Sequence, residues 1–206
     1  MRLKSGRQIL CSYLVGADGA NSRVRRQIIG KYDGNVLFME QRVEGASDAI
    51  EGVVSSEYKD GYYYLFPSVG CDVVGLGCRN LTHKVFRDLL ARNGVEETKI
   101  MGADISVKEV DSGMDNVMLI GDAGGFANKI SYEGLYYAIA TGRNAAEAII
   151  EGRSFKETNR DILRRKRKEW VLCGVFYSWL GRGIARLLAI SPGIVRRIFV
   201  WGMGGA

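Results

Sequence analysis

The stretch VMLIGDAGGFANKISYEGLYYAIATGRNAAEAII, residues 117–150, constrains the fold of this chain more than any other part of the sequence. A run with β-branched residues ends at Gly121-Asp122, and after a loop the chain resumes near Gly134 as a helix rich in glycine and alanine. The strand end would direct a carboxylate into a crevice, where it can accept hydrogen bonds from ligand hydroxyls. Free N–H groups at the start of the following helix favour negative charge. Because Gly134 lacks a Cβ, a flat ring could approach the backbone there.

Such a crevice would suit a ligand in which a polyol is joined to an aromatic ring that gains negative charge on reduction. A flavin fits this description. The alternative is an ordinary strand–loop–helix unit in which Asp122 only caps its own backbone. Local physical chemistry leaves both interpretations open.

The patterning of the whole chain predicts a mixed α/β fold. Aromatic and β-branched runs between about residues 35 and 78 predict an antiparallel sheet, and residues 2–15 predict a hairpin. Ser22 is expected to cap a short helix, and an amphipathic helix is expected to end at Gly94. Two more strands, ADISVKEV and NVMLIG, precede the helix after Gly134. In that helix, apolar or small residues recur with the spacing of a buried face, at positions 135, 138, 139, 142, 146, 149 and 150.

The composition narrows the chemistry that the side chains can carry. With 47% hydrophobic and 25% charged residues, the 206-residue chain has the composition of an ordinary globular protein. The four cysteines form no CxxC pair, and no apolar leader opens the sequence, so we expect reduced thiols in a cytoplasm. A single histidine, His83, removes most His-based triads and zinc sites. We therefore expect no metal site and chemistry supplied by a cofactor.

Basic residues are concentrated in the C-terminal part of the chain. Residues 151–206 contain twelve Lys or Arg and four Asp or Glu, a charge of +8, whereas the whole chain carries +6. Residues 160–201 interleave arginines with aromatic residues, which is typical of a helix lying on an anionic membrane surface. The alternative is a helical subdomain that packs its apolar face on the core. The longest uncharged run, residues 170–181, is too short to span a bilayer, and without a recognised module we expect no nucleic-acid partner.

Two loops resemble the fingerprints of the flavoprotein hydroxylase superfamily. LVGADGANSRVRR resembles its DG fingerprint, and the matching residues are Asp18-Gly19, Ser22 and Val24-Arg25. Gly121-Asp122, with Gly134 twelve residues after the aspartate, resembles its GD fingerprint. Between the two loops, GYYYLFPSVGCDVVGLG resembles the Tyr-x-Trp-x-Phe-Pro signature of the geranylgeranyl reductases, with tyrosine in place of tryptophan. Over roughly residues 1–150 the chain therefore resembles the geranylgeranyl reductase branch of the FAD-dependent oxidoreductases.

This resemblance implies FAD as cofactor and the reduction of carbon–carbon double bonds of a prenyl (geranylgeranyl-type) lipid by hydride from reduced flavin. Gly121-Asp122 would bind the ribityl chain of FAD, and the backbone of Gly134 and Leu135 would face the pyrimidine side of the flavin. Asp18 and Arg25 would lie near the diphosphate and ribose. An apolar pocket for the prenyl chain would be walled by the residues of the third motif, Tyr62, Tyr64, Phe66 and Pro67. The alternative for these aromatics is ordinary sheet packing.

The resemblance also implies a fold class, α+β / α/β. We expect an incomplete FAD-binding domain of the glutathione-reductase-like flavoprotein type, with an inserted antiparallel sheet and a helical C-terminal tail. The partial FAD-binding domain would comprise residues 1–33 and 109–152, the substrate domain residues 34–108, and the basic helical region residues 153–206. The family's GxGxxG unit, which cradles the FAD pyrophosphate, is missing. We therefore expect an N-terminal FAD-binding part to be a partner of this chain, which alone would be inactive.

The GD loop departs from the family at Lys129, Ser131 and Tyr132, where relatives usually have a proline and then a Thr-Gly pair. Lys129 could supply positive charge near the flavin or be solvated, and Tyr132 could narrow the approach to the ring. Two other functions stay open. One is a flavin monooxygenase or halogenase acting on an aromatic substrate, and the other is a truncated, flavin-free module that binds a partner or a membrane. The expected location is the cytoplasm, with peripheral attachment to the inner face of the membrane as a further expectation.

Overall fold

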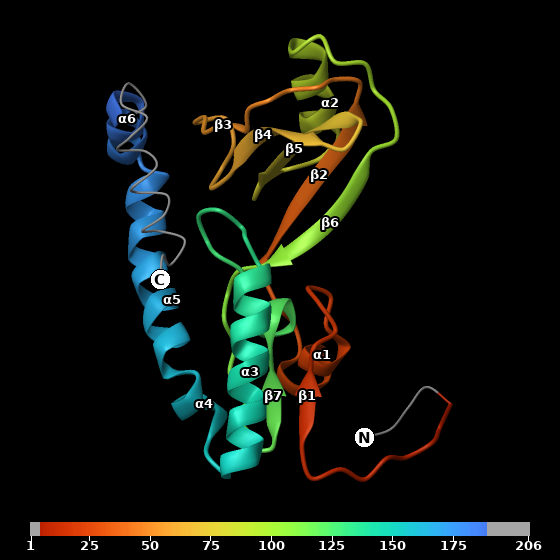
Figure 1. The fold of residues 1–206 in the computed structure, drawn as a ribbon, viewed down its shortest axis with the longest axis vertical. Coiled ribbons are helices and arrows are strands. Elements are labelled where there is room, and N and C mark those ends of the chain that lie inside the picture. Colours follow the sequence, from red (N-terminus) through yellow and green to blue (C-terminus); the bar gives the residue numbers. More distant parts are fainter. Residues whose placement is uncertain (1–4, 189–206) are drawn as a thin grey trace. The chain divides into compact units, whose positions relative to one another are not determined.

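The computed structural model describes residues 5–188, and these form two compact units (Figure 1). The first unit takes in the described chain up to Phe38 together with Met101–Trp170. The second unit takes in Met39–Ile100 and the described chain from Val171 onward. The three regions expected from the sequence, residues 1–33 with 109–152, 34–108 and 153–206, stay a prediction.

A two-stranded parallel sheet lies at the centre of the first unit. β1 (Leu14–Gly16) pairs with β7 (Val117–Leu119), with Leu14 opposite Val117 and Gly16 opposite Leu119. The first strand of the hairpin predicted for residues 2–15 lies outside the described residues, and its second strand is present only from Leu14, where it pairs in parallel with a strand from much later in the chain. This pairing brings the ends of the two loops with flavoprotein fingerprints to one edge of the sheet.

Helices flank this parallel pair (Figure 1). Ser22 caps α1 as predicted, since its hydroxyl accepts a hydrogen bond from the backbone N–H of Arg25 at 2.9 Å. The short turn after β7 is a 3₁₀ helix, and the long helix that follows it begins after Gly134, also as predicted. The helical elements of the unit are α1 (Arg23–Ile29), η1 (Gly121–Gly124), α3 (Leu135–Glu151), α4 (Phe155–Thr158) and the first part of α5 (Arg160–Phe176).

The face that α3 buries is not the face predicted from its apolar residues. Leu135, Ile139 and Ile150 belong to the predicted face, yet they are 73%, 66% and 83% exposed. The buried face consists of Tyr137, Thr141, Ala145 and Ala148. Small and polar residues face the strand because α3 approaches it closely, with Ala145 and Ala148 packed on Met118.

The second unit is built on an antiparallel sheet. The strand order is β3-β4-β5-β2-β6, and β4 and β5 form a hairpin in which Tyr62 lies opposite Gly77 and Ser68 opposite Cys71. Asp72 is buried and accepts hydrogen bonds from the backbone and hydroxyl of Ser47, which fixes the loop before β3. The strands are β2 (Asn35–Val43), β3 (Glu51–Val53), β4 (Tyr62–Ser68), β5 (Cys71–Cys78) and β6 (Met101–Ser106). The start of β2, up to Phe38, and the whole of β6 are assigned to the first unit.

The antiparallel sheet and both remaining helices were expected. α2 (His83–Arg92) is followed by Gly94, whose φ of +65° lies in the left-handed region, as predicted for the end of this helix. α6 (Trp179–Leu188) continues the helical tail. No described helix has both the length and the apolarity that crossing a bilayer requires. The tail residues beyond Leu188, including the end of the predicted membrane-surface segment 160–201, lie outside the described residues.

Candidate functional site

The site predicted at the end of β7 brings Asp122 and the start of α3 together. A Cβ built on Gly134 would lie 3.1 Å from the Oδ1 atom of Asp122. Glycine at position 134 therefore leaves the half-buried Asp122 carboxylate open beside the first turn of α3. Over the described residues no side chain caps this helix start, so its N–H groups and positive dipole end are available to a ligand.

Gly121 permits this close approach. Its φ of +51° lies in the left-handed region, and a Cβ built on it would lie 3.2 Å from the Cβ of Ala138. Its backbone N–H donates a hydrogen bond to Oγ1 of Thr141 at 2.9 Å. A larger residue at position 121 would push α3 away from the strand end, so this glycine is needed for the geometry around Asp122.

Burial and the neighbouring groups shift the pKa of the Asp122 carboxyl in opposite directions. Burial raises the pKa of its carboxyl group above the ordinary value, and the backbone N–H of Ser106 and the cations Arg25 and Lys166 partly offset this rise. A carboxylate whose ionised form is held by such partners is suited to accept hydrogen bonds from hydroxyls.

Asp18, the aspartate of the first loop, directs its carboxylate onto the start of α1. The carboxylate accepts hydrogen bonds from the Ser22 hydroxyl and from the backbone N–H groups of Arg23, at 2.7 Å, and Val24, at 3.2 Å. Burial raises the pKa of Asp18, but these hydrogen bonds outweigh that effect and lower it. The carboxylate therefore holds the loop in shape, and its predicted place near the FAD diphosphate and ribose stays a prediction.

Arg25 joins the two loops. Its side chain is 3% exposed, and its guanidinium donates to the backbone oxygens of Asp122, at 2.9 Å, and Ala123, at 3.0 Å. It also donates to the backbone oxygen of Ala20 and lies 3.5 Å from the centre of the Tyr32 ring. Sequence reasoning selected Arg25, and the structure shows that its guanidinium bonds mainly to backbone oxygens on both sides of the site.

A buried ionic cluster lies beneath the GD loop, and sequence reasoning missed it. Lys166 of α5 is fully buried, and its Nζ lies 2.8 Å from Oε2 of Glu169 and donates to the backbone oxygen of Ala127. The Tyr137 hydroxyl donates to the other oxygen of Glu169. Burial lowers the pKa of Lys166, and Glu169 opposes this. Nothing distinguished Lys166 from its neighbours in the basic run RRKRK.

The departures from the family pattern in the GD loop are accommodated in two ways. Tyr132 has a φ of +60°, a conformation that favours glycine, and its buried ring contacts Phe38 with ring centres 4.9 Å apart. Lys129 is 11% exposed and lies 3.4 Å from Glu109. The interpretation of Lys129 as a solvated side chain is therefore wrong.

The aromatic residues predicted to wall a prenyl pocket share one face of β4. The rings of Tyr64 and Phe66 stack with centres 4.5 Å apart, and those of Tyr62 and Tyr64 are 6.0 Å apart. Tyr64 lies across Gly75 of β5 and donates to Oε2 of Glu40 at 2.9 Å. Pro67 is exposed at the end of the strand. The row is present as predicted, and its use as a substrate pocket stays a prediction.

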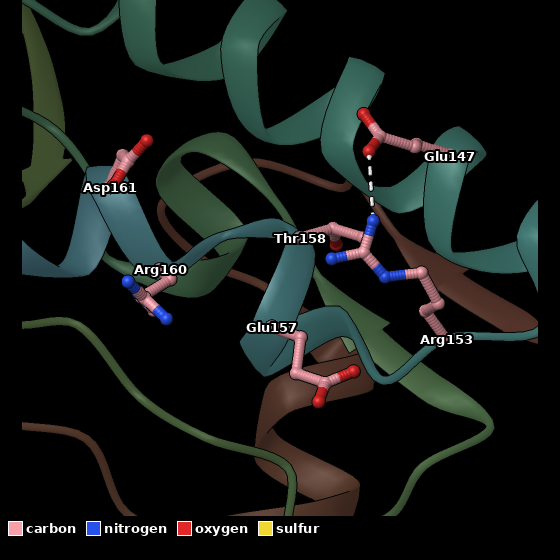
Figure 2. Close-up of a pocket in the computed structure, with 6 residues that line it drawn as sticks. All are labelled: Glu147, Arg153, Glu157, Thr158, Arg160 and Asp161. Carbon is pink, nitrogen blue, oxygen red and sulfur yellow. Dashed lines mark ion pairs between the residues drawn. The ribbon is translucent and has the colours of Figure 1, made fainter.

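A cavity of about 370 Å³ lies where α3, α4 and α5 meet (Figure 2). Its lining carries both signs of charge, and Arg153 lies 3.5 Å from Glu147 across it. Because these charges compensate one another, the cavity does not select a charged ligand, and we assign no ligand to it.

Comparison with known proteins supports the resemblance over most of the chain. Geranylgeranyl diphosphate reductase of Arabidopsis thaliana is 33% identical over 178 residues, which are 76% of this chain and 38% of that protein. Digeranylgeranylglycerophospholipid reductase 3 of Methanosphaera stadtmanae is 26% identical over 91% of this chain and 51% of that protein. The chain therefore spans about two fifths to half of the length of these relatives. No family model matches.

Solved structures share the fold. A geranylgeranyl bacteriochlorophyll reductase-like protein of Thermoplasma acidophilum superposes with a TM-score of 0.69 at 22% identity, over 87% of this chain and 54% of that one. A probable FAD-dependent monooxygenase of Pseudomonas aeruginosa gives a TM-score of 0.56 at 18% identity, over 87% and 59%. The fold is that of FAD-binding flavoproteins. The resemblance predicted from the DG, GD and aromatic motifs is thus confirmed, and the chain is homologous to the part of the geranylgeranyl reductases that it spans.

Proposed function

We propose that this chain is part of an FAD-dependent reductase that reduces carbon–carbon double bonds of a prenyl lipid. The observation that carries the proposal is the open Asp122 carboxylate beside the uncapped start of α3, in a chain homologous to geranylgeranyl reductases. A flavin monooxygenase or halogenase would use the same two loops, but the similar proteins of that kind share less than a quarter of their residues with this chain and support the fold alone.

The residues of the site fit FAD. Gly121-Asp122 would bind the ribityl chain, and the backbone of Gly134 and Leu135 would face the pyrimidine side of the ring. The dipole of α3 would favour the negative charge that the ring gains on reduction. Arg25 holds both loops in place through the backbone. When bound and reduced, FAD supplies hydride for the double bond, and the aromatic row on β4 would line the prenyl chain.

We propose further that a polypeptide outside this chain completes the FAD site, as expected from the missing GxGxxG unit. The support is the first unit's own surface. A parallel sheet is normally covered on both faces, yet over the described residues this sheet has two strands, and Val15 of β1 is 37% exposed. The apolar face of α3 is exposed at Leu135, Ile139 and Ile150. Additional parallel strands with their helices would cover these surfaces.

The experiment is flavin retention through gel filtration, read from the visible absorbance, by the chain alone and co-expressed with the remaining portion of the Arabidopsis relative. The co-expressed preparation, at least, should retain flavin. Asp122→Ala should abolish flavin retention, whereas the exposed control Asp115→Ala should leave it unchanged. Retained flavin would then be reduced chemically and offered geranylgeranyl diphosphate, with mass spectrometry to detect the gain of two hydrogens per reduced bond. Absence of flavin in both preparations contradicts the FAD site, and flavin without product contradicts the prenyl substrate.

The basic tail supports a membrane partner and, with it, a cytoplasmic location at the inner face of a membrane. Trp170 of α5 is 68% exposed, and Trp179 and Leu180 of α6 are 79% and 52% exposed. The basic run 164–168 lies on α5. We expect the chain to sediment with anionic vesicles and not with neutral ones, and binding should weaken with salt. Equal sedimentation with both kinds of vesicle would contradict an electrostatic attachment.

A further inference from the structure

We propose that Lys166 is a positioning residue of the flavin site, which keeps the Asp122 carboxyl ionised from behind the GD loop. Lys166 belongs to α5 and is fully buried. The residues that connect it to Asp122 all belong to the first unit. This role rests on the proposed function, because the ligand that Asp122 binds is taken to be the flavin.

A short path of contacts links Lys166 to the open carboxylate of Asp122. The Nζ atom of Lys166 donates a hydrogen bond to the backbone oxygen of Ala127. Ala127 lies next to Gly134, because a Cβ built on Gly134 would lie 3.8 Å from the Cβ of Ala127. The same built Cβ would lie 3.1 Å from Oδ1 of Asp122. In such a buried setting little water screens the charge of the lysine, so it acts on the carboxyl.

The groups that face Lys166 hold it in place and favour its charged form. Oε2 of Glu169 lies 2.8 Å from its Nζ, and the ring centre of Tyr137 lies 5.0 Å from it. Burial lowers the pKa of Lys166, Glu169 and Glu109 raise it, and Lys129 lowers it. Glu169 is itself fixed, because it accepts hydrogen bonds from the Tyr137 hydroxyl and, at 3.4 Å, from the backbone N–H of Lys129. A cation is therefore fixed beneath the loop.

The groups that face Asp122 come from three elements. Burial raises the pKa of its carboxyl, and the backbone N–H of Ser106 in β6, Arg25 in α1 and Lys166 in α5 lower it. An ionised carboxylate accepts hydrogen bonds through both oxygens, whereas a protonated one uses one oxygen as a donor. Lys166 therefore favours the form of Asp122 that accepts hydrogen bonds from the hydroxyls of a polyol.

The alternative is that the buried pair of Lys166 and Glu169 only holds the loop against α5. The two roles predict opposite shifts when the pair is replaced by apolar residues. If the loop stays closed and only the positive charge is lost, the pKa of Asp122 rises further. If the loop opens, water reaches the carboxyl, and its pKa falls toward the ordinary value of 3.8.

The test is a pH titration of Asp122, followed by carbon NMR of the whole chain without flavin. The carboxyl signal is identified by its absence from Asp122→Asn. The double variant Lys166→Met/Glu169→Leu removes the lysine without leaving Glu169 unpaired. In this variant Asp122 should protonate at a higher pH than in the parent. The control Asp161→Leu/Arg164→Met removes an exposed ion pair with the same spacing on α5 and should leave the midpoint of Asp122 unchanged.

The single variant Lys166→Met should move the midpoint of Asp122 in the same direction, so the result does not depend on the folding of one variant. An unchanged or lower midpoint in the variants that lack Lys166, or an equal rise in the control, would overturn the proposal.

Flavin retention separates this role from the proposed function. In the co-expressed preparation, visible absorbance should show that flavin is lost at a higher pH from Lys166→Met/Glu169→Leu than from the parent. If the NMR midpoint of Asp122 rises but flavin retention does not follow it, Lys166 acts on Asp122 as proposed, and the assignment of Asp122 to the flavin is contradicted.

Discussion

The interiors of the two units differ in how many polar and charged side chains they bury. Of the buried polar or charged side chains in the described part of the chain, all but Gln41 and Asp72 belong to the first unit. They include Arg25, Lys166 and Glu169, which anchor the loops around Asp122. Both units also bury aliphatic and aromatic residues, and in the second unit these include Val74, Leu76, Phe86, Leu89 and Leu90.

This difference follows from what each unit contains. The antiparallel sheet closes its own hydrogen bonds through a hairpin and can bury apolar residues against α2. The first unit has long loops with many backbone groups, and these groups need buried polar partners. A unit built in this way fixes its loops accurately, and it leaves apolar surface on α3 for another polypeptide.

The largest effect should come from breaking the polar interior. Lys166→Met leaves Glu169 buried without its cation, and loss of one member of a buried pair costs about 3–5 kcal/mol. Urea unfolding measures this change, and the exposed control Lys168→Met should stay within about 0.5 kcal/mol of the parent. The double variant Lys166→Met/Glu169→Leu should be more stable than Lys166→Met. If it is less stable, the two residues are not coupled as a pair.

A smaller effect is expected from the apolar interior. Leu90 of α2 is 2% exposed, and Leu90→Ala should cost about 3 kcal/mol because it removes buried methyl groups and leaves a cavity. Val69→Ala in the β4–β5 turn, where Val69 is 99% exposed, is the matched control and should have almost no effect in the same unfolding measurement. An equal loss in both variants would mean that the second unit does not depend on this core.

The sequence predicted local structure and motifs better than it predicted contacts between distant segments. The antiparallel sheet between about residues 35 and 78, the Ser22 cap and the start of α3 agree with prediction because hydrophobic patterning and capping are local. The buried face of α3 was predicted wrongly, because apolar spacing does not tell which partner covers a helix.

The residues that support the site show the same limit. Arg25 was selected through a motif, yet its backbone partners Asp122 and Ala123 lie almost a hundred positions away. Lys166 belongs to a charge run that predicts solvent exposure, and only the tertiary fold reveals its burial beneath the GD loop. Contacts of this kind depend on how the loops cross in space, which a single sequence does not encode in any periodic pattern.

The smallest effect concerns Asp18 and distinguishes a role in the loop from a role in ligand binding. Asp18→Asn weakens the hydrogen bonds to the Ser22 hydroxyl and the start of α1, and it should cost about 1 kcal/mol at neutral pH, the usual size of a lost cap. The pKa of Asp18 is lowered in the fold, so its stabilisation is present above the ordinary value of 3.8 and is lost as the pH falls through the folded pKa.

The difference in unfolding free energy between the parent and Asp18→Asn should therefore be constant near neutrality and shrink as the pH falls below about 3.8. The control Asp48→Asn, at an exposed position of the second unit, should stay within about 0.5 kcal/mol of the parent at neutral pH. A difference that does not change with pH would mean that the ionised carboxylate is not what holds the loop. If Asp18→Asn leaves stability unchanged but abolishes flavin retention, Asp18 acts on the ligand, as the family resemblance implies, and its hydrogen bonds to α1 do not stabilise the fold.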